Sequence, residues 1–181
     1  MNFTHTPIEG VIVIEPTVFN DSRGFFYESY RKELFARNGI KDDFVQDNVS
    51  SSAQGALRGL HYQAAPRAQA KLMRVLRGSV YDVAVDIRPK SKTFGKFFSI
   101  VLSAENRKML YIPEGFAHGF CVMEDKTEFM YKVSNYYSPE HERGVLWSDP
   151  GLAIPWPKLD RAFILSEKDK KYPVLKDLKI T

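Results

Sequence analysis

The sequence has little cysteine and histidine and no long hydrophobic run. Its 181 residues include one cysteine, Cys121, which excludes an intrachain disulfide framework and predicts a reducing compartment, the cytoplasm. No apolar segment approaches the roughly 18 residues that a membrane-spanning helix needs. The first residues have neither a basic region nor a small-residue cleavage site, so we expect a strand there and no signal peptide.

Composition is that of a folded globular protein. Hydrophobic residues make up 44% and charged residues 27% of the chain, which excludes a disordered protein. The length predicts one domain over residues 1–181, with a C-terminal segment from about 160 to 181 packing on it. There is no sequence repeat, linker or low-complexity segment.

Aromatic residues are abundant, with 13 phenylalanines, nine tyrosines and two tryptophans, and this favours strands. Short apolar or alternating runs separated by turn residues predict an all-β sandwich or barrel. The expected strands lie at 11–14, 44–50, 72–87, 97–102, 109–112, 119–123 and 127–134. Gly78, in the middle of the longest run, predicts a hairpin or a bend.

Helices are expected to be few and short. Helical spacing of apolar residues and a following Gly39 predict a helix over 29–38. A single turn is expected at 104–108. Ser166 and Asp169 have the spacing of a capping box, which predicts a short helix before Pro173.

Basic residues are concentrated between positions 58 and 96. In this block only Asp82 and Asp86 oppose nine basic residues, namely Arg58, Arg67, Lys71, Arg74, Arg77, Arg88, Lys90, Lys92 and Lys96. Such an excess indicates an anionic partner or a solvated basic face. No nucleic-acid-binding module accompanies it, so a small phosphate-bearing ligand is favoured over nucleic acid.

Two histidines lie in motifs that can carry chemistry. The stretch Pro113-x-Gly115-x-x-His118 follows an apolar run and resembles the second half of a cupin motif, the signature of a small jelly roll. A metal-binding cupin would have a second histidine near His61 and a carboxylate further on. Gln63 and Lys71 occupy those regions, and a cationic lysine opposes metal binding, so we expect no metal.

Acid–base chemistry is the alternative to metal chemistry. His61 can act as a general base near neutral pH, and cations such as Arg58 and Lys71 would stabilise a developing enolate oxygen. Tyr131 could deliver a proton from its phenol. A hydrogen-bonded core histidine and a packed strand tyrosine are the structural alternatives for His61 and Tyr131.

Taken together, the ordered motifs resemble the dTDP-4-dehydrorhamnose 3,5-epimerase family from about Val18 to Asp169. The matching stretches are Asp21–Phe26 with Glu28, Gln46–Asn48, Leu57–Gln63, Gln69–Leu72, Asp82–Arg88, Ile112–Phe120, Tyr131-Lys132 and Trp147–Pro150. The resemblance implies a cupin jelly roll that works without metal or cofactor on dTDP-4-dehydro-6-deoxy-D-glucose. The ketone at C4 of this sugar acidifies the hydrogens at C3 and C5, so that one site can invert both carbons through enolates.

By resemblance, His61 removes the proton, Tyr131 reprotonates from the opposite face and Lys71 stabilises the enolate oxygen. Asp169 would orient His61 as the second member of a dyad. The capping-box spacing supports a different role for Asp169, as a helix cap, and both roles stay open at this point.

The remaining site residues also follow from the resemblance. Phosphate or sugar contacts are implied for Arg23, Arg58 and Lys168, framing of the nucleotide or sugar for Glu28, Gln46, Asp47 and Asn48, and substrate contacts for His118 and Glu142. Tyr137 is expected to stack on thymine, with its neighbour Tyr136 as the alternative in register. Family members are homodimers that exchange N-terminal strands, so some of these residues could serve the partner's site.

Three other functions remain open at the level of sequence. The first is a 3-only or 5-only epimerase of a related dTDP-4-keto-6-deoxysugar. The second is a non-catalytic sugar-nucleotide-binding cupin, and the third is a metal-dependent cupin oxygenase.

Overall fold

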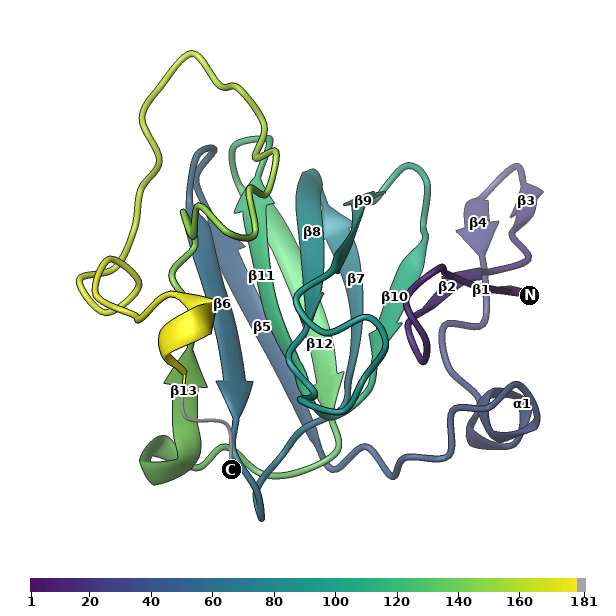
Figure 1. Cartoon of the computed structure of the whole chain (residues 1–181). Helices are drawn as coiled ribbons and strands as arrows, with labels where there is room; N and C mark the ends of the chain where they lie inside the picture. Colours follow the sequence, from purple (N-terminus) through teal and green to yellow (C-terminus); the bar gives the residue numbers. More distant parts are fainter. Residues whose placement is uncertain (179–181) are drawn as a thin grey trace.

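Two antiparallel β-sheets face each other in the computed structural model, which describes residues 1–178 (Figure 1). The six-stranded sheet has the order β1 (Asn2–His5), β2 (Ile12–Glu15), β10 (Met109–Ile112), β7 (Lys71–Arg77), β12 (Thr127–Val133) and β5 (Gln46–Ser52). The five-stranded sheet has the order β13 (Glu142–Gly144), β6 (Leu57–Gln63), β11 (Phe116–Val122), β8 (Ser79–Asp86) and β9 (Phe97–Ser103). The predicted all-β jelly roll is therefore confirmed.

The chain crosses from one sheet to the other at Gly78. Strand β7 ends at Arg77 in the six-stranded sheet and β8 begins at Ser79 in the five-stranded sheet, so Gly78 marks a bend and not a hairpin. Its φ is +73°, a conformation that glycine adopts without steric cost.

A small hairpin and a few short helices complete the structure. Strands β3 (Phe19–Asp21) and β4 (Gly24–Phe26) form a separate two-stranded sheet, followed by helix α1 (Lys32–Arg37). Two 3₁₀ turns, η1 and η2, lie at Pro139–His141 and Leu175–Asp177. None of the helices within 1–178 combines the length and apolar character that crossing a bilayer requires.

Most of the strands expected from periodicity are present, and the helix predictions are less accurate. Helix α1 is shorter than the predicted 29–38. The turn predicted at 104–108 is present over 104–106, whereas the helix predicted after Ser166 is wrong, because that segment forms a turn. The expected strand near the N-terminus is present as β1, whereas β3, β4, β6 and β13 were not predicted.

The main core fills the space between the two sheets. Met73, Val75 and Phe129 contribute from the six-stranded sheet, and Phe116 and Phe120 contribute from the five-stranded sheet; all are buried. Rings of Phe120 and Phe129 lie 4.3 Å apart between centroids. Aromatic side chains thus join the two layers, which accounts for part of the high phenylalanine content.

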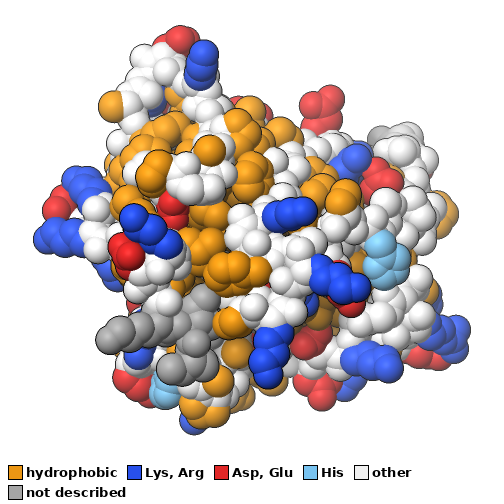
Figure 2. All heavy atoms as spheres, viewed as in Figure 1, with side chains coloured by type: hydrophobic (Ala, Val, Ile, Leu, Met, Phe, Trp, Pro, Cys, Tyr) orange, Lys and Arg blue, Asp and Glu red, His pale blue; other side chains and the backbone are white. Residues whose placement is uncertain are grey.

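The outer face of the five-stranded sheet is covered by the chain that follows β13. Val145, Leu152 and Leu175 from this segment pack against Leu60 and Val83 of the sheet. Figure 2 shows hydrophobic side chains gathering on this side of the molecule. The segment after β13 is consequently held in place along the back of β6, next to His61. The single-domain organisation of residues 1–181 stays a prediction.

A buried carboxylate fastens the loop that follows β8. Asp86 is fully buried and accepts hydrogen bonds from the Arg88 guanidinium and from the hydroxyls of Ser91 and Thr93. Burial opposes ionisation, but these hydrogen bonds outweigh it and lower the pKa of Asp86 to about 2. Arg88 in turn lies over the Phe116 ring at the start of β11.

We predict that Asp86→Asn lowers the free energy of unfolding by about 3–5 kcal/mol, because it leaves the Arg88 charge without its partner. The control is Glu15→Gln, which breaks a half-exposed pair with Lys108 and should cost about 0–1 kcal/mol. Urea unfolding at pH 7 measures both. The difference should shrink as the pH falls from about 4 toward about 2, because Asp86 protonates in the unfolded chain before it does in the fold. If both variants lost the same free energy of unfolding, this would contradict the stabilising role of the buried Asp86 carboxylate.

Candidate active site

A cavity of about 320 Å³ opens between the two sheets. Its walls come from β5 and β12 on one side, from β6 and β13 on the other, and from the loops beside them. The lining residues are Gln46, Asn48, His61, Tyr62, Gln63, Gln69, Lys71, Tyr131, Tyr137 and Glu142. Seven of these residues were predicted for the site, among them Tyr137, which was expected to stack on thymine.

His61 and Asp169 are hydrogen-bonded to each other. The Nε2 atom of His61, on β6, lies 2.5 Å from Asp169 Oδ1, and the Asp169 side chain is almost fully buried. Burial raises the pKa of Asp169, but the hydrogen bond and charge of His61 outweigh this effect and keep the pKa below its usual value. The structure therefore brings together the two residues that the resemblance paired.

Ser166 and Asp169 make one hydrogen bond of the predicted capping box, but no helix follows. Ser166 Oγ accepts a hydrogen bond from the Asp169 backbone N–H at 3.1 Å, as in a capped helix, but the chain continues as a turn. The Asp169 carboxylate points to His61. The sequence left two roles open for Asp169, a helix cap and a partner of His61. The geometry agrees with the second role.

Tyr131 lies on the opposite wall from His61. It belongs to β12 of the six-stranded sheet, whereas His61 belongs to β6 of the five-stranded sheet, and both line the cavity. Burial raises the pKa of Tyr131, and the charge of Arg58 offsets this only in part. The phenol is thus protonated at neutral pH and is available as a proton donor.

Lys71, at the start of β7, lines the cavity close to His61. Its Nζ is 3.5 Å from the His61 carbonyl oxygen. Burial lowers its pKa to about 8, against the attraction of Asp82 and Glu142. Lys71 therefore loses its proton more easily than a lysine in water does, and binding of negative charge would stabilise its ammonium form.

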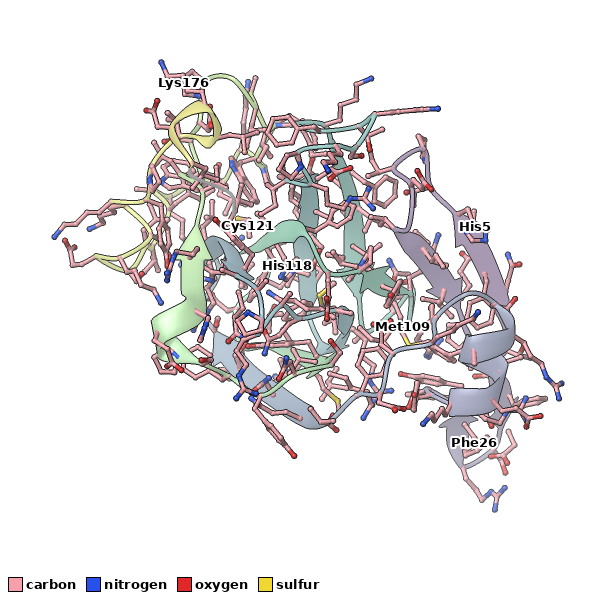
Figure 3. The ribbon with its side chains drawn as sticks, turned by 60° about the horizontal axis from the view of Figure 1, so that its bottom comes forward. His5, Phe26, Met109, His118, Cys121 and Lys176 are labelled. Atoms are coloured by element: carbon pink, nitrogen blue, oxygen red, sulfur yellow. The ribbon has the colours of Figure 1, made fainter. Side chains whose placement is uncertain are left out.

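His118 is buried and is not part of the cavity lining. It is opposite His61 in the β6–β11 ladder, and its Nε2 lies 3.0 Å from both carboxylate oxygens of Asp82. Figure 3 shows His118 at the centre of the fold. Burial lowers its pKa, with Asp82 opposing the shift. In this chain the ring of His118 contacts Asp82, and the predicted substrate contact by His118 stays a prediction.

Glu142 joins two other predicted residues at the mouth of the cavity. Its carboxylate accepts one hydrogen bond from Lys168 Nζ at 2.7 Å and one from the Tyr137 hydroxyl at 3.0 Å. Tyr137, and not its neighbour Tyr136, lines the cavity. More than half of the Tyr137 side chain is exposed, so a ring face is open to a ligand.

Three glutamines hold the loop that carries Tyr137. Gln46 accepts a hydrogen bond from the Tyr137 backbone N–H at 3.1 Å, Gln63 accepts one from the Ser138 N–H at 2.7 Å, and Gln69 donates one to the Asn135 carbonyl at 2.7 Å. Tyr62, Gln63 and Gln69 line the cavity as well, although no role was predicted for them. The sequence signal that could have identified them is their position next to His61 and Lys71 in the same motifs.

Four further predicted binding residues do not line the cavity of this chain. Arg23 is in the β3–β4 hairpin and pairs with Asp21, and Glu28 is exposed and pairs with Arg31. Asp47 alternates with Gln46 and Asn48 on β5, so it faces away from the cavity, where it pairs with Lys132. Arg58 is exposed near Tyr131 and donates a hydrogen bond to Ser52.

The basic block of residues 58–96 does not form one surface. Lys71 alone among the nine lines the cavity, while Arg88 is bound to Asp86 and Arg74 lies on the outer face of β7 next to Met130. One of the nine charges thus reaches the cavity of this chain, and the use of the basic block for a phosphate-bearing ligand stays a prediction. The folded chain distributes it over both sheets and the loop after β8.

Within residues 1–178, no group of three or more His, Cys, Asp or Glu side chains is arranged to hold a metal ion. Lys71 stands in the cavity beside His61, where a metal-binding cupin would place further ligands. Activity without metal or cofactor stays a prediction.

The fold is a cupin-type jelly roll with a cavity between its sheets, and His61 and Tyr131 line this cavity from facing sheets. Residues 5–177 match the family described as dTDP-4-dehydrorhamnose 3,5-epimerase. The chain is 55% identical over 170 residues to the enzyme of that name from Shigella flexneri, covering 93% of each chain. The chain belongs to this family of isomerases.

Solved structures agree with this assignment. A 3,5-epimerase from Legionella pneumophila in complex with dTDP-4-keto-L-rhamnose is 47% identical, with a TM-score of 0.94, and the match covers 98% of this chain and 94% of that one. ChmJ, a 3′-monoepimerase from Streptomyces bikiniensis in complex with dTDP-quinovose, is 37% identical, with a TM-score of 0.88, over 94% of this chain and 86% of that one. The predicted family, fold and enzyme class are confirmed.

We predict that the Lys71 ammonium titrates at about 8, well below the roughly 10.4 of a lysine in water. Following the ζ-ammonium by NMR as a function of pH measures this, with Lys71→Gln to assign the signal. In Asp82→Asn the pKa should fall further, because the Asp82 charge favours the ammonium. A titration near 10.4 in the wild-type protein would show that Lys71 is fully hydrated.

Proposed function

We propose that this chain epimerises dTDP-4-dehydro-6-deoxy-D-glucose at C3 and C5 to give dTDP-4-dehydro-L-rhamnose. The observation that carries the proposal is the placement of the His61–Asp169 pair and Tyr131 on opposite walls of one cavity. Inversion of a carbon needs a base on one face and an acid on the other. The family membership and the dTDP-sugar bound to the Legionella structure support the substrate class.

The proton transfers follow from the hydrogen bonds. Asp169 accepts a hydrogen bond from the Nε2–H of His61, which leaves Nδ1 as the basic nitrogen. The Nδ1 atom takes the hydrogen from C3 or C5, both acidified by the C4 ketone, and the electrons move onto the C4 oxygen. The Lys71 ammonium stabilises this enolate, and Tyr131 then gives a proton to the opposite face of the same carbon.

Both groups must be reset between the two inversions. His61 has gained a proton and Tyr131 has lost one, so His61 releases its proton to water and Tyr131 regains one from water. The negative Asp169 carboxylate stabilises the imidazolium in the interval. The cavity is open at its mouth, which allows this exchange with solvent.

The nucleotide is proposed to lie at the cavity mouth. Tyr137 would stack on thymine, a contact worth ~1–3 kcal/mol, and Glu142, Gln46 and Asn48 would frame the sugar nucleotide. Lys168 and Arg58 would contact the diphosphate. Asp47 and His118 have other partners in this chain, and we propose that they act indirectly, through Lys132 and through Asp82.

A homodimer with exchanged N-terminal strands would place Arg23 and Glu28 in the partner's site. The β3–β4 hairpin that precedes Glu28 exposes Phe19, Phe25 and Phe26, each more than half accessible. Figure 3 shows Phe26 at the edge of the molecule, far from His118 at its centre. An exposed apolar hairpin of this kind is suited to cover a second copy of the chain. We also place the reaction in the cytoplasm, on the basis of the scarcity of cysteine.

An epimerase that inverts only one carbon is the second candidate. It is favoured by the similarity to the 3′-monoepimerase from Streptomyces bikiniensis, because the same base and acid would serve a single inversion. The two candidates differ in the carbons that exchange their hydrogen with solvent.

In D₂O we predict that the wild-type enzyme returns a product with deuterium at both C3 and C5, seen by proton NMR. Deuterium at only one carbon would show that the enzyme inverts a single carbon, and the second candidate function would then replace the first. In His61→Asn, exchange at both carbons should fall by roughly 10²–10⁴-fold, the contribution typical of a positioned base, with dTDP affinity unchanged. His5→Asn, on β1 at the edge of the fold, is the control. Normal exchange in His61→Asn would reject His61 as the base.

Mixing two inactive variants tests the shared site. Arg23→Ala and His61→Asn should each lose activity as homodimers. After denaturation and joint refolding, mixed dimers contain one site with neither substitution, so that about a quarter of wild-type activity returns under random pairing. If subunit exchange is demonstrated and no activity returns, Arg23 does not belong to the partner's site.

A further inference from the structure

We propose that Tyr172 is a positioning residue for His61, and that Gly144 is the residue that makes room for it. The proposal rests on the role of His61 as the base. Tyr172 does not line the cavity and carries no role in the reaction described above. Its ring contacts the imidazole from the side, and this contact holds the ring plane of His61 in the orientation that Asp169 requires.

The ring of Tyr172 meets the imidazole of His61 edge to face. The two centroids are 5.7 Å apart and the planes are inclined by 69°, a geometry in which aromatic rings attract each other. Asp169 lies three residues before Tyr172 in the same turn and bonds to Nε2. One short segment therefore supplies both the hydrogen-bond partner and the packing partner of the base.

Gly144 provides the space that the ring occupies. It is directly opposite His61 in the β6–β13 ladder. A Cβ atom added to Gly144 would lie 2.5 Å from Tyr172 Cε2 and 2.6 Å from both Cδ2 and Cζ. The Tyr172 ring thus covers the Gly144 Cα, at the place where a cross-strand side chain would otherwise contact His61.

The backbone of Gly144 does not itself need glycine. Its φ is outside the left-handed region in which eight other glycines of this chain lie within the described residues. An alanine at 144 would be free of backbone strain, and its cost would come only from the collision with the Tyr172 ring. This difference makes Gly144→Ala a specific probe of the ring.

The segment holds Tyr172 in place through its backbone and not through the hydroxyl. Leu146 N–H, just after β13, donates to the Pro173 carbonyl at 2.8 Å, and Ser166 fixes the start of the turn. The Tyr172 hydroxyl is buried and has no hydrogen-bond partner of ordinary geometry among the residues that the structure describes, although the Lys168 ammonium is close enough to oppose the rise of its pKa that burial causes. The ring is therefore the functional part, and phenylalanine should replace tyrosine.

The expected defect is one of turnover and not of binding. Tyr172→Ala leaves the imidazole free to rotate and admits water beside its bond to Asp169. A misplacement of about 1 Å costs up to ~10²-fold in rate, so kcat should fall roughly 10- to 100-fold. The KM and the affinity for dTDP should stay unchanged, and Tyr172→Phe should keep wild-type kcat.

Gly144→Ala should reproduce the loss of Tyr172→Ala, because it displaces the ring. The double variant Gly144→Ala/Tyr172→Ala should be no slower than Tyr172→Ala, because the collision has been removed. Additive losses in the double variant would mean that Gly144 acts independently of the ring. A Tyr172→Phe variant as slow as Tyr172→Ala would assign the effect to the hydroxyl, and both results would overturn the proposal.

A spectroscopic measurement separates this proposal from the assignment of the base. In ¹⁵N-histidine-labelled protein, the Nε2 proton of His61 should be visible in the wild type and in Tyr172→Phe. It should be lost to exchange with water in Tyr172→Ala, provided that circular dichroism shows the variant to be folded. A retained signal in folded Tyr172→Ala with unchanged kcat would overturn the proposal, whereas an active His61→Asn would overturn only the role of His61 as the base.

Discussion

The hydrogen bond between His61 and Asp169 joins two parts of the chain that are 108 residues apart. It can form only if the segment after β13 returns along the outer face of the five-stranded sheet. That return is driven by burial of Val145, Leu152 and Leu175 against the sheet. The apolar packing on one face of β6 thus positions the carboxylate that orients the histidine, and the chemistry of the cavity depends on it.

The two-layer architecture explains how one small cavity can hold the proposed base and the proposed acid on opposite sides. His61 and Tyr131 come from different sheets, and the aromatic core between the sheets fixes their separation. Burial shifts the pKa of Tyr131 and the pKa of Lys71 in opposite directions, and both shifts suit the proposed proton transfer. It raises the pKa of the Tyr131 phenol and lowers that of the Lys71 ammonium, so the first keeps its proton and the second gains most from a nearby enolate.

Sequence patterns predicted the sandwich well because its strands are short, aromatic and separated by turn residues. The pattern was weakest where tertiary contacts override local preference. Ser166 and Asp169 have the spacing of a helix start, and the Ser166 bond forms, but the attraction of Asp169 to His61 takes precedence over a helix. Strand β6 was missed because Gly59 interrupts its alternation.

The side on which a residue lies was harder to predict than its strand. The register between β6 and β11 shifts after His118, and this irregularity is not visible in the sequence. His118 itself is paired with His61, yet its ring contacts Asp82 and does not line the cavity. Arg23 and Glu28 illustrate a different limit: their motif was recognised, but one chain alone does not bring them to the cavity. Tyr172 had no motif, since only the fold places its ring over Gly144.

The most direct test of a base and an acid on opposite faces is deuterium exchange catalysed by Tyr131→Phe in D₂O. With the base intact and the acid removed, the enzyme should exchange the hydrogen at C3 or C5 of the recovered substrate while it forms almost no inverted product. Inverted product at the wild-type rate would contradict the account, because it would show that the proton on the second face does not come from Tyr131.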